Sequence, residues 1–424
     1  MSIRFLRPWN GYDDGDKATL SQNEEARLVG LGVATYALYG GKSLAGKVPS
    51  YLGQVANNVG QLNEYYATYI VCMSRSAHIA SEHLSNIKLI LPNWGTKSAG
   101  GFPETNADVA ATIEASIEYP AGIYTRVTFN RENIGSANPG ENFESDFVGI
   151  YIPRGEMFWI RNYYSAPGAS GIFLTNAQPL MSIAPALEGA NFSATSTPNL
   201  VMATGAGQRG DGFPSATTHY IAPLAILQET TNPSVFIHGD SISVGQADTC
   251  DQTLSTGIAE RAVFPLACIT MSRGGIRAAN STAAYAVNWK KQFSLAKYCS
   301  HVLVLLGSND CVDGTAAATI AGYLAQIKKD WFSDKIFIIG TIMPRADATN
   351  TTPMANEAIR QALNLIIRNN GVTGAVGYLD FDAAATAAYQ EGVFKSASFT
   401  SDGVHPLQVG NSYIAANTKV DLLK

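Results

Sequence analysis

Three polar stretches of this sequence hold side chains that could do chemistry together. Gly-Asp-Ser at 239–241 ends the run VFIHGDS, and Gly-Ser-Asn-Asp at 307–310 ends the run HVLVLLGSND. In the stretch SDGVH, Asp402 and His405 lie three positions apart. A serine hydroxyl, a histidine oriented by a carboxylate and an amide that donates to an oxyanion are the groups that attack on a carbonyl requires. Whether they act together depends on where the fold places them.

Taken singly, each stretch is more often structural than catalytic. A serine after Gly-Asp commonly caps a helix or lies in a turn. Asn309 and Asp310 are common strand-to-helix turn residues, and His405 alone would be a histidine of a surface loop. A metal site is favoured still less, because the six histidines show no ligand spacing. What favours chemistry is that all three stretches fall within one predicted domain.

The elements that would position these side chains begin at about residue 226. Apolar residues at helical spacing predict one helix around 320–327 and another around 359–367. Between such helical segments lie five continuously apolar runs, as in parallel strands buried on both faces: SVFIHG, VFPLACITM, HVLVLLG, KIFIIGTI and AVGYLDF. The pattern predicts an α/β fold over 226–424, a three-layer α/β/α domain with a mainly parallel five-stranded sheet.

Functional groups of such a sheet gather beyond the carboxyl ends of its strands. Ser241 and Asn309 both fall at such ends, and His405 falls in the last loop. One domain thus supplies a nucleophile, an oxyanion donor, a base and a group that orients the base. Because chance placement of all four is improbable, the sequence predicts an enzyme.

Residues 46–225 show a different pattern. The segments IEASIEYPAGIYTRVTFN and DFVGIYIPRGEMFWIRNYY carry short alternating runs of β-branched and aromatic residues, separated by Pro, Gly and Asn clusters. This predicts an antiparallel β-sandwich of the jelly-roll kind, preceded by a separate N-terminal segment at 1–45. Trp159, Tyr163 and Tyr164 could stack on sugar rings, although aromatic residues in strands more often form the core.

Composition narrows the class of protein. The 424 residues are 46% apolar and 15% charged, with a net charge of -5 and no dense Lys/Arg stripe, which argues against a nucleic-acid partner. The five cysteines are scattered without a C-x-x-C pair, as expected for free thiols made in a reducing compartment. No apolar stretch is long enough for a membrane span, and the start of the sequence lacks the apolar region of a Sec signal peptide.

Over residues 230–424 the sequence resembles the GDSL, or SGNH, family of esterases and lipases. GDSI resembles the first family block, which implies that Ser241 is the nucleophile and that its own N–H belongs to the oxyanion hole. MSRGGIRA resembles the second block, which implies Gly275, with Gly274 as the alternate, as the next oxyanion donor. Here the chain departs from the family, because many members have Asn shortly before the glycine, where Ser272 stands.

GSND and SDGVH resemble the third and fifth family blocks. This implies that Asn309 is the side-chain donor of the oxyanion hole, that His405 is the general base and that Asp402 orients it. The implied reaction is hydrolysis of an ester through an acyl-enzyme intermediate, with no metal and no organic cofactor.

The first half of the chain resembles β-sandwich regions that precede SGNH domains in some bacterial and bacteriophage proteins acting on carbohydrates. The opening RFLRPWNGYDDGD resembles N-terminal segments of phage structural proteins, which implies attachment to a virion. The expected protein is therefore a phage or prophage tail-associated carbohydrate esterase. It would remove O-acetyl groups from a capsule or O-antigen at the bacterial surface, with other virion proteins and further copies of itself as partners.

Two other functions stay open. One is a bacterial acyl esterase or lipase acting on small or lipid-like esters, in the cytoplasm or after secretion without a Sec signal. The other is a virion adhesin that only binds glycan through a vestigial hydrolase domain. The intact set of Ser241, Asn309, Asp402 and His405 argues against the second, because decay usually removes at least one such residue.

Overall fold

The computed structural model describes two compact units, residues 1–46 and 47–424. Side chains are described for 49–57, 59, 69–96, 103–166, 168, 189–203, 221–249, 253–387 and 392–418, and the backbone alone for 2–5, 17–18, 34–37, 61–66, 172–176 and 219–220. The first unit contains a small antiparallel sheet in the order β2-β1-β3, built from β1 (Ser2–Phe5), β2 (Lys17–Ala18) and β3 (Ala34–Ala37).

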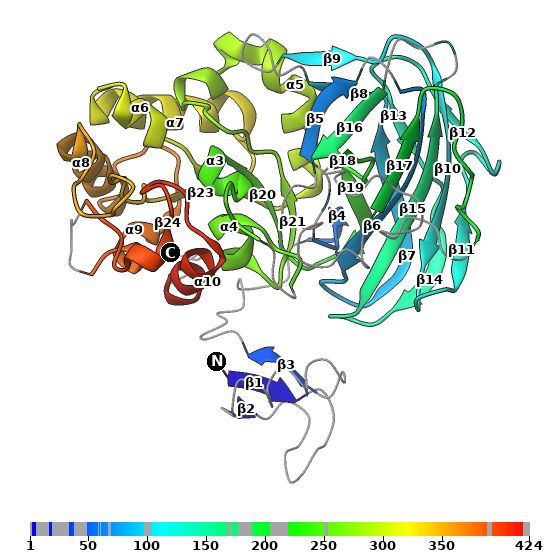
Figure 1. The fold of residues 1–424 in the computed structure, drawn as a ribbon, viewed down its shortest axis with the longest axis horizontal. Coiled ribbons are helices and arrows are strands. Elements are labelled where there is room, and N and C mark those ends of the chain that lie inside the picture. The colour runs from blue at the N-terminus through cyan, green and yellow to red at the C-terminus, as the bar shows by residue number, and fades with distance from the viewer. Residues whose placement is uncertain are drawn as a thin grey trace. The chain divides into compact units, whose positions relative to one another are not determined.

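The first half of the larger unit is an antiparallel β-sandwich, as predicted (Figure 1). One sheet has the order β11-β10-β15-β6-β17, with β12 also paired to β10. Its strands are β6 (Val71–Ile79), β10 (Ala111–Glu118), β11 (Tyr124–Val127), β12 (Gly135–Ala137), β15 (Met157–Ser165) and β17 (Gly189–Ser193).

The second sheet has the order β13-β7-β19-β4, with β14 also paired to β7. Its strands are β4 (Tyr51–Gln54), β7 (Leu84–Pro92), β13 (Asn142–Glu144), β14 (Val148–Ile152) and β19 (Ala225–Thr230). Two smaller sheets complete this half, β18-β16-β5 and the hairpin β8-β9, from β5 (Gln61–Tyr66), β8 (Trp94–Thr96), β9 (Glu104–Asn106), β16 (Ile172–Asn176) and β18 (His219–Tyr220).

The sandwich buries both faces of β15. Phe158 and Ile160 point into the common core between the two sheets, as the alternation predicts. Trp159, on the other face, is only 8% exposed because Leu254 of the following domain packs against it. Tyr164 is 2% exposed, and Tyr163 packs beside Met73 and Val201. Trp159 and Tyr164 are therefore core residues and not an exposed platform for sugar, and Tyr163 is partly buried.

The second half is a five-stranded parallel sheet, as predicted. Its order is β21-β20-β22-β23-β24, from β20 (Ser234–Gly239), β21 (Ala267–Thr270), β22 (His301–Leu305), β23 (Ile336–Gly340) and β24 (Gly377–Leu379). The chain moves from β20 to β21 in one direction and from β21 across to β22, β23 and β24 in the other. Right-handed crossovers therefore put the connecting helices on opposite faces of the sheet.

Helices cover the parallel sheet in two layers (Figure 1). α4 (Gly257–Val263) packs against α10 (Gln408–Asn417), which also contacts α9 (Phe381–Ala385). On the other side, α7 (Ala317–Trp331) packs against α8 (Glu357–Arg368), and α5 (Ala286–Ser294) follows β21. The short helices α3 (Ser241–Val244) and α6 (Ser308–Val312) begin directly beyond β20 and β22. The reversal of strand order lies between these two strands, where open α/β sheets form their ligand crevice.

The junction between the halves lies later than the predicted boundary at 225/226. β19 pairs with β4 and β7, so residues 226–230 belong to the antiparallel sheet. The parallel sheet begins at Ser234. Only residues 231–233 separate the two strands, which is too short for a crossover helix, so the chain changes sheets here. Apolar residues of both halves form one continuous core.

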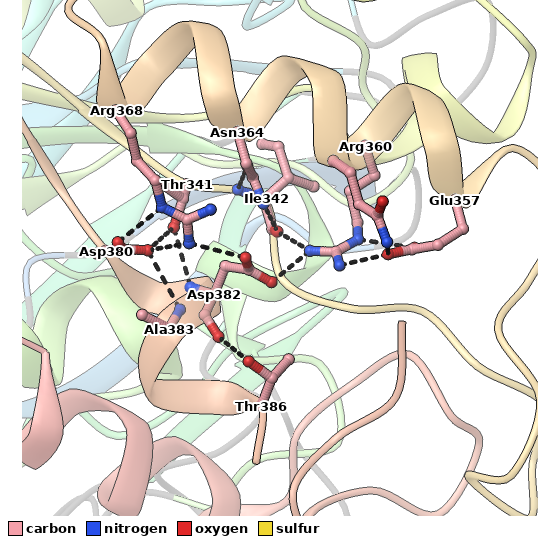
Figure 2. A network of polar contacts seen from close by, with 11 residues as sticks. Thr341, Ile342, Glu357, Arg360, Asn364, Arg368, Asp380, Asp382, Ala383 and Thr386 are labelled. Atoms are coloured by element: carbon pink, nitrogen blue, oxygen red, sulfur yellow. Dashed lines mark hydrogen bonds and ion pairs between the residues drawn. The ribbon is translucent and has the colours of Figure 1, made fainter. Parts of the chain in front are cut away.

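A buried network of charged side chains fixes α8 against the end of the sheet (Figure 2). Arg368 donates to both oxygens of Asp380 and, at 2.8 Å, to Asp382. Arg360 donates to the other oxygen of Asp382 and to Glu357. The side chain of Asp382 is only 2% exposed, so two guanidinium groups replace its water.

Removing the charge of Asp382 should therefore be costly. We expect Asp382→Asn to lower the free energy of unfolding by about 3 kcal/mol, because two buried guanidinium groups lose their shared counter-ion. Asp313→Asn is the matched control, because its ion pair with Arg277 is exposed and worth less than about 1 kcal/mol. Urea unfolding of both variants measures the difference, and equal losses would contradict a structural role for the network.

Candidate active site

Ser241 lies at the carboxyl end of β20 as the first residue of α3. The helix is capped by Asp240, whose carboxylate accepts the N–H of Ile242 at 3.0 Å. Asp240, and not Ser241, is therefore the residue that caps this helix. This leaves the Ser241 hydroxyl available for another partner.

That partner is His405, 164 positions later in the chain. The Ser241 Oγ and His405 Nε2 atoms are 2.9 Å apart. His405 Nδ1 lies 2.6 Å from Oδ2 of Asp402. Because an ionised carboxylate only accepts, the imidazole proton belongs on Nδ1, and Nε2 accepts the serine hydroxyl. The structure therefore brings the three predicted residues together in the order that base-assisted nucleophilic attack requires.

The loop holds the Asp402 carboxylate ionised. Its Oδ1 accepts the N–H groups of Val404 and His405, both at 2.8 Å, and the hydroxyl of Thr400 at 3.1 Å. Partial burial by itself raises the pKa of Asp402, but the hydrogen bonds from His405 and Val404 outweigh it and lower the pKa to about 2. Asp402 is therefore a carboxylate throughout the neutral range, as an orienting group must be.

Gly403 makes the tight path of this loop possible. Its φ is +79°, and a Cβ there would lie 2.2 Å from the carbonyl oxygen of Asp347 and 2.3 Å from that of Ala346. Both obstacles are backbone atoms, which cannot rotate away. The glycine of the predicted D-x-x-H stretch is thus needed for the approach of two loops as well as for its own turn.

The second predicted block lies next to Ser241. A Cβ at Gly274 would be 3.8 Å from the Cβ of Ser241, whereas one at Gly275, whose φ is +77°, would meet nothing within 4 Å. Among the residues that the structure describes, the N–H groups of Ser241, Gly274 and Gly275 have no backbone acceptor. Both glycines thus stay candidates for the oxyanion hole, with Gly274 the one beside Ser241.

Asn309 lies in α6 beyond β22, the strand next to β20. Its Nδ2 donates to the carbonyl oxygen of Ile276 at 2.9 Å, just after the two glycines. The neighbouring Asp310 accepts the N–H of Ala278 at 2.9 Å. The block GSND therefore ties α6 to the glycine loop, and a second Nδ2 proton of Asn309 is left for another acceptor.

Arg345 also belongs to this site, although sequence reasoning missed it. It follows β23, and its Nη1 lies 3.2 Å from Asn309 Oδ1 and 3.3 Å from Ser308 Oγ. Burial lowers the pKa of its guanidinium, while the carboxyl groups of Asp240 and Asp402 oppose that shift. The signal was present in the sequence, because Arg345 stands just beyond the predicted strand KIFIIGTI, at the same edge as Ser241 and Asn309.

Burial raises the pKa of Asp240, whereas it lowers the pKa of Arg345. It raises the pKa of this carboxyl to about 7, and Asp310 adds to the rise, whereas the Ile242 N–H and Arg345 lower it. Asp240 is 2% exposed and lies one residue before Ser241. An acid of raised pKa is thus built into the turn that carries Ser241.

Other potential ligands are engaged within the protein. His238, just before the turn, contacts Met271 O and Ser281 Oγ through its two ring nitrogens. In the described part of the chain, no three His, Cys, Asp or Glu side chains gather as a metal site would need. The four cysteines described there are buried and free, and Cys250 lies outside the described residues. No described helix is long and apolar enough to cross a membrane.

Comparison with known proteins finds a family model that matches part of this half of the chain. Residues 237–412 match the GDSL-like Lipase/Acylhydrolase family. Similar solved structures include a lipolytic protein of the G-D-S-L family from Veillonella parvula, a catalytic mutant of an acetylxylan esterase from Geobacillus stearothermophilus and a lipase from a goat rumen metagenome.

These structures are distant from the chain. Their identities to it are 16%, 16% and 12%, and their TM-scores are 0.33, 0.32 and 0.33. Each match covers 43% of this chain and, in the same order, 93%, 90% and 94% of the other. Likeness of this degree carries no information on the substrate. Comparison with curated proteins finds no match.

The close packing at Gly403 predicts a specific defect. We expect Gly403→Ala to lower kcat/KM for an aryl ester at least about tenfold and to destabilise the fold by roughly 1–3 kcal/mol, because the loop with Asp402 and His405 must move. Gly322→Ala in α7 is the control, because a Cβ there meets open space and Ala favours a helix by about 1 kcal/mol. Full activity of Gly403→Ala would show that the loop tolerates the displacement.

The raised pKa of Asp240 predicts a pH dependence of stability. The carboxyl keeps its proton up to about pH 7 in the folded protein, but loses it near its ordinary value of 3.8 in the unfolded chain. The unfolded state therefore binds fewer protons between these values, and the free energy of unfolding falls as the pH rises through this window. Asp240→Asn keeps an oxygen for the Ile242 N–H but removes the titration.

We therefore expect stability to fall less between pH 4 and pH 7 in Asp240→Asn than in the wild type. The difference should be a few kcal/mol, at about 1.4 kcal/mol per pKa unit. Urea unfolding across this pH range measures it, with the exposed Asp334→Asn as the control. Parallel curves for wild type and Asp240→Asn would contradict a buried, protonated carboxyl.

Proposed function

We propose that this protein is a serine esterase that removes O-acetyl groups from a bacterial surface polysaccharide. The match of residues 237–412 to the GDSL-like Lipase/Acylhydrolase family supports the esterase part. The observation that carries the esterase part is the continuous contact from Ser241 through His405 to Asp402. The proposal that the acyl group is acetyl and that the substrate is a polysaccharide goes beyond this contact.

The proposed reaction follows from these contacts. Ser241 Oγ attacks the ester carbonyl as His405 Nε2 takes its proton, and the imidazolium that forms is stabilised by the ionised Asp402. The tetrahedral oxyanion is held by the N–H of Ser241, by that of Gly275 or Gly274, and by Nδ2 of Asn309. When the tetrahedral intermediate collapses, the sugar oxygen takes the proton from His405 and leaves as a hydroxyl, and water then releases acetate from the acyl-enzyme.

The arrangement of the two halves supports a large substrate such as a polysaccharide. Arg273, next to Gly274, donates to Thr96 at the end of β8, so the β8–β9 hairpin of the sandwich reaches the glycine loop. Glu104 of β9 accepts the N–H groups of Lys291 and Gln292 in α5, at 2.9 and 2.7 Å. The β8–β9 hairpin, which lies beside the glycine loop, would contact parts of the substrate remote from the ester. The sandwich would do so without Trp159 and Tyr164, which are buried.

The proposed place of action is a phage tail at the bacterial surface. The support is the separate compact unit at 1–46, which could attach the enzyme to other virion proteins, together with the resemblance of its sequence to such segments. Assembly of several copies on one tail belongs to the same proposal.

The test is acetate release from O-acetylated capsules and O-antigens, followed by NMR of the polysaccharide. We expect release by the wild type and a loss on the order of 10⁴-fold or more in Ser241→Ala, because the nucleophile is gone. Ser243→Ala is the matched control, a fully buried serine two positions later in the same short helix.

Two results would contradict the proposal in separate ways. Undiminished release by Ser241→Ala would remove Ser241 as the nucleophile. Wild-type hydrolysis of long-chain aryl esters in preference to acetates, with no release from any polysaccharide, would favour an acyl esterase or lipase instead.

A further inference from the structure

We propose that Arg345 is a positioning residue of the oxyanion hole, which fixes and polarises the side-chain amide of Asn309. Arg345 Nη1 donates to Asn309 Oδ1 at 3.2 Å and to the neighbouring Ser308 Oγ at 3.3 Å. The proposal rests on the esterase part of the proposed function and adds a residue to it. It does not depend on which ester is the substrate.

The contacts of Asn309 determine which way its amide points. Oδ1 faces a guanidinium, which can only donate, and Nδ2 faces the carbonyl oxygen of Ile276, which can only accept, at 2.9 Å. Rotating the amide by 180° would set donor against donor and acceptor against acceptor. The two partners thus hold the amide in one orientation, with the second Nδ2 proton free for the oxyanion.

The charge on Arg345 strengthens that proton as a donor. A charged donor on the amide oxygen draws electron density from the amide nitrogen, and hydrogen bonds in such a chain reinforce one another. Among the described residues Arg345 has no carboxylate within ion-pair distance, and its Nε is buried without a hydrogen-bond partner. Its positive charge is therefore available to stabilise negative charge that develops beside Asn309.

The fold holds Arg345 from both sides. Three residues earlier, Ile342 is held by α8, because its N–H donates to Asn364 at 2.7 Å and its carbonyl accepts from Arg360 at 2.7 Å (Figure 2). One residue later, the N–H of Ala346 donates to the carbonyl of Gly403 at 2.8 Å. The loop of Arg345 therefore connects the buried network of α8 with the loop of Asp402 and His405. A guanidinium on so constrained a backbone keeps its place during the reaction.

The experiment is a double-mutant cycle on hydrolysis of 4-nitrophenyl acetate. We expect Arg345→Met to lower kcat about 10- to 100-fold with KM changed less than twofold, because the oxyanion exists only in the transition state. In the Asn309→Ala background the same substitution should change kcat less than twofold, because Arg345 acts through the amide that is absent. Arg345→Lys should recover part of the loss by restoring charge.

Several results would overturn the proposal. Equal losses from Arg345→Met in both backgrounds would mean that Arg345 does not act through Asn309. A loss confined to KM would indicate that it binds the substrate instead. Arg154→Met, which removes an exposed arginine of the sandwich outside the site, controls for the general loss of positive charge and should change kcat less than twofold. Thermal unfolding of each variant separates these effects from loss of the fold.

A second readout needs no turnover at all, so a failure of the proposed function leaves the inference testable. The side-chain amide signals of Asn309 in a ¹⁵N-labelled protein are identified by their absence in Asn309→Ala. We expect Arg345→Met to shift and broaden these signals, because the amide loses its charged partner. Signals unchanged in Arg345→Met would refute the inference even in a protein that hydrolyses no ester.

Discussion

The contact between Ser241 Oγ and His405 Nε2 is the constraint that the rest of the structure has to satisfy. It joins the first strand end of the parallel sheet to the last loop before α10, so every intervening strand and helix must be in place before it forms. The two loops are held independently, by the Asp240 cap on one side and by the hydrogen bonds around Asp402 on the other. The hydroxyl and the imidazole therefore meet without either side chain having to search for its position.

The strand order explains why these groups converge. In the order β21-β20-β22-β23-β24, connections leave β20 and β22 in opposite directions, which opens a crevice at their carboxyl ends. Ser241 and Asn309 stand on the two sides of that crevice. This could be predicted from the sequence, because continuous apolar runs mark parallel strands and polar residues directly after them mark the functional edge.

What could not be predicted depended on contacts between segments distant in sequence. The junction was placed too early, because AILQET has the apolar character of a strand but gives no sign of which sheet it joins. The alternation along β15 predicts that Phe158 and Ile160 lie in the core. It cannot predict that Trp159, on the other face, is also buried, because Trp159 packs against Leu254 of the other half. Arg345 was missed because an arginine after a strand is ordinary until its distance to Asn309 is known.

The sandwich and the α/β half form one compact unit. They share a continuous apolar core, and polar contacts cross between them at Thr96 and Arg273, and between Asn57 Nδ2 and the carbonyl of Thr253 at 2.5 Å. The glycine loop next to the nucleophile is thus supported partly from the sandwich. Loss of the sandwich would expose this core and remove one of the contacts that hold the loop.

The charges around the nucleophile suit the oxyanion better than they suit stability. Asp240 and Asp310 are carboxyls whose pKa values burial raises, and Arg345 is a partly buried cation without an ion pair in the described structure. A fold selected only for stability would pair or expose such groups. Here α8 and its ion-pair network hold the Arg345 loop in place, so the cation stays beside Asn309 before any substrate arrives. The network at Asp382 thus maintains an arrangement of charge that, in the proposed reaction, becomes favourable only when the oxyanion forms.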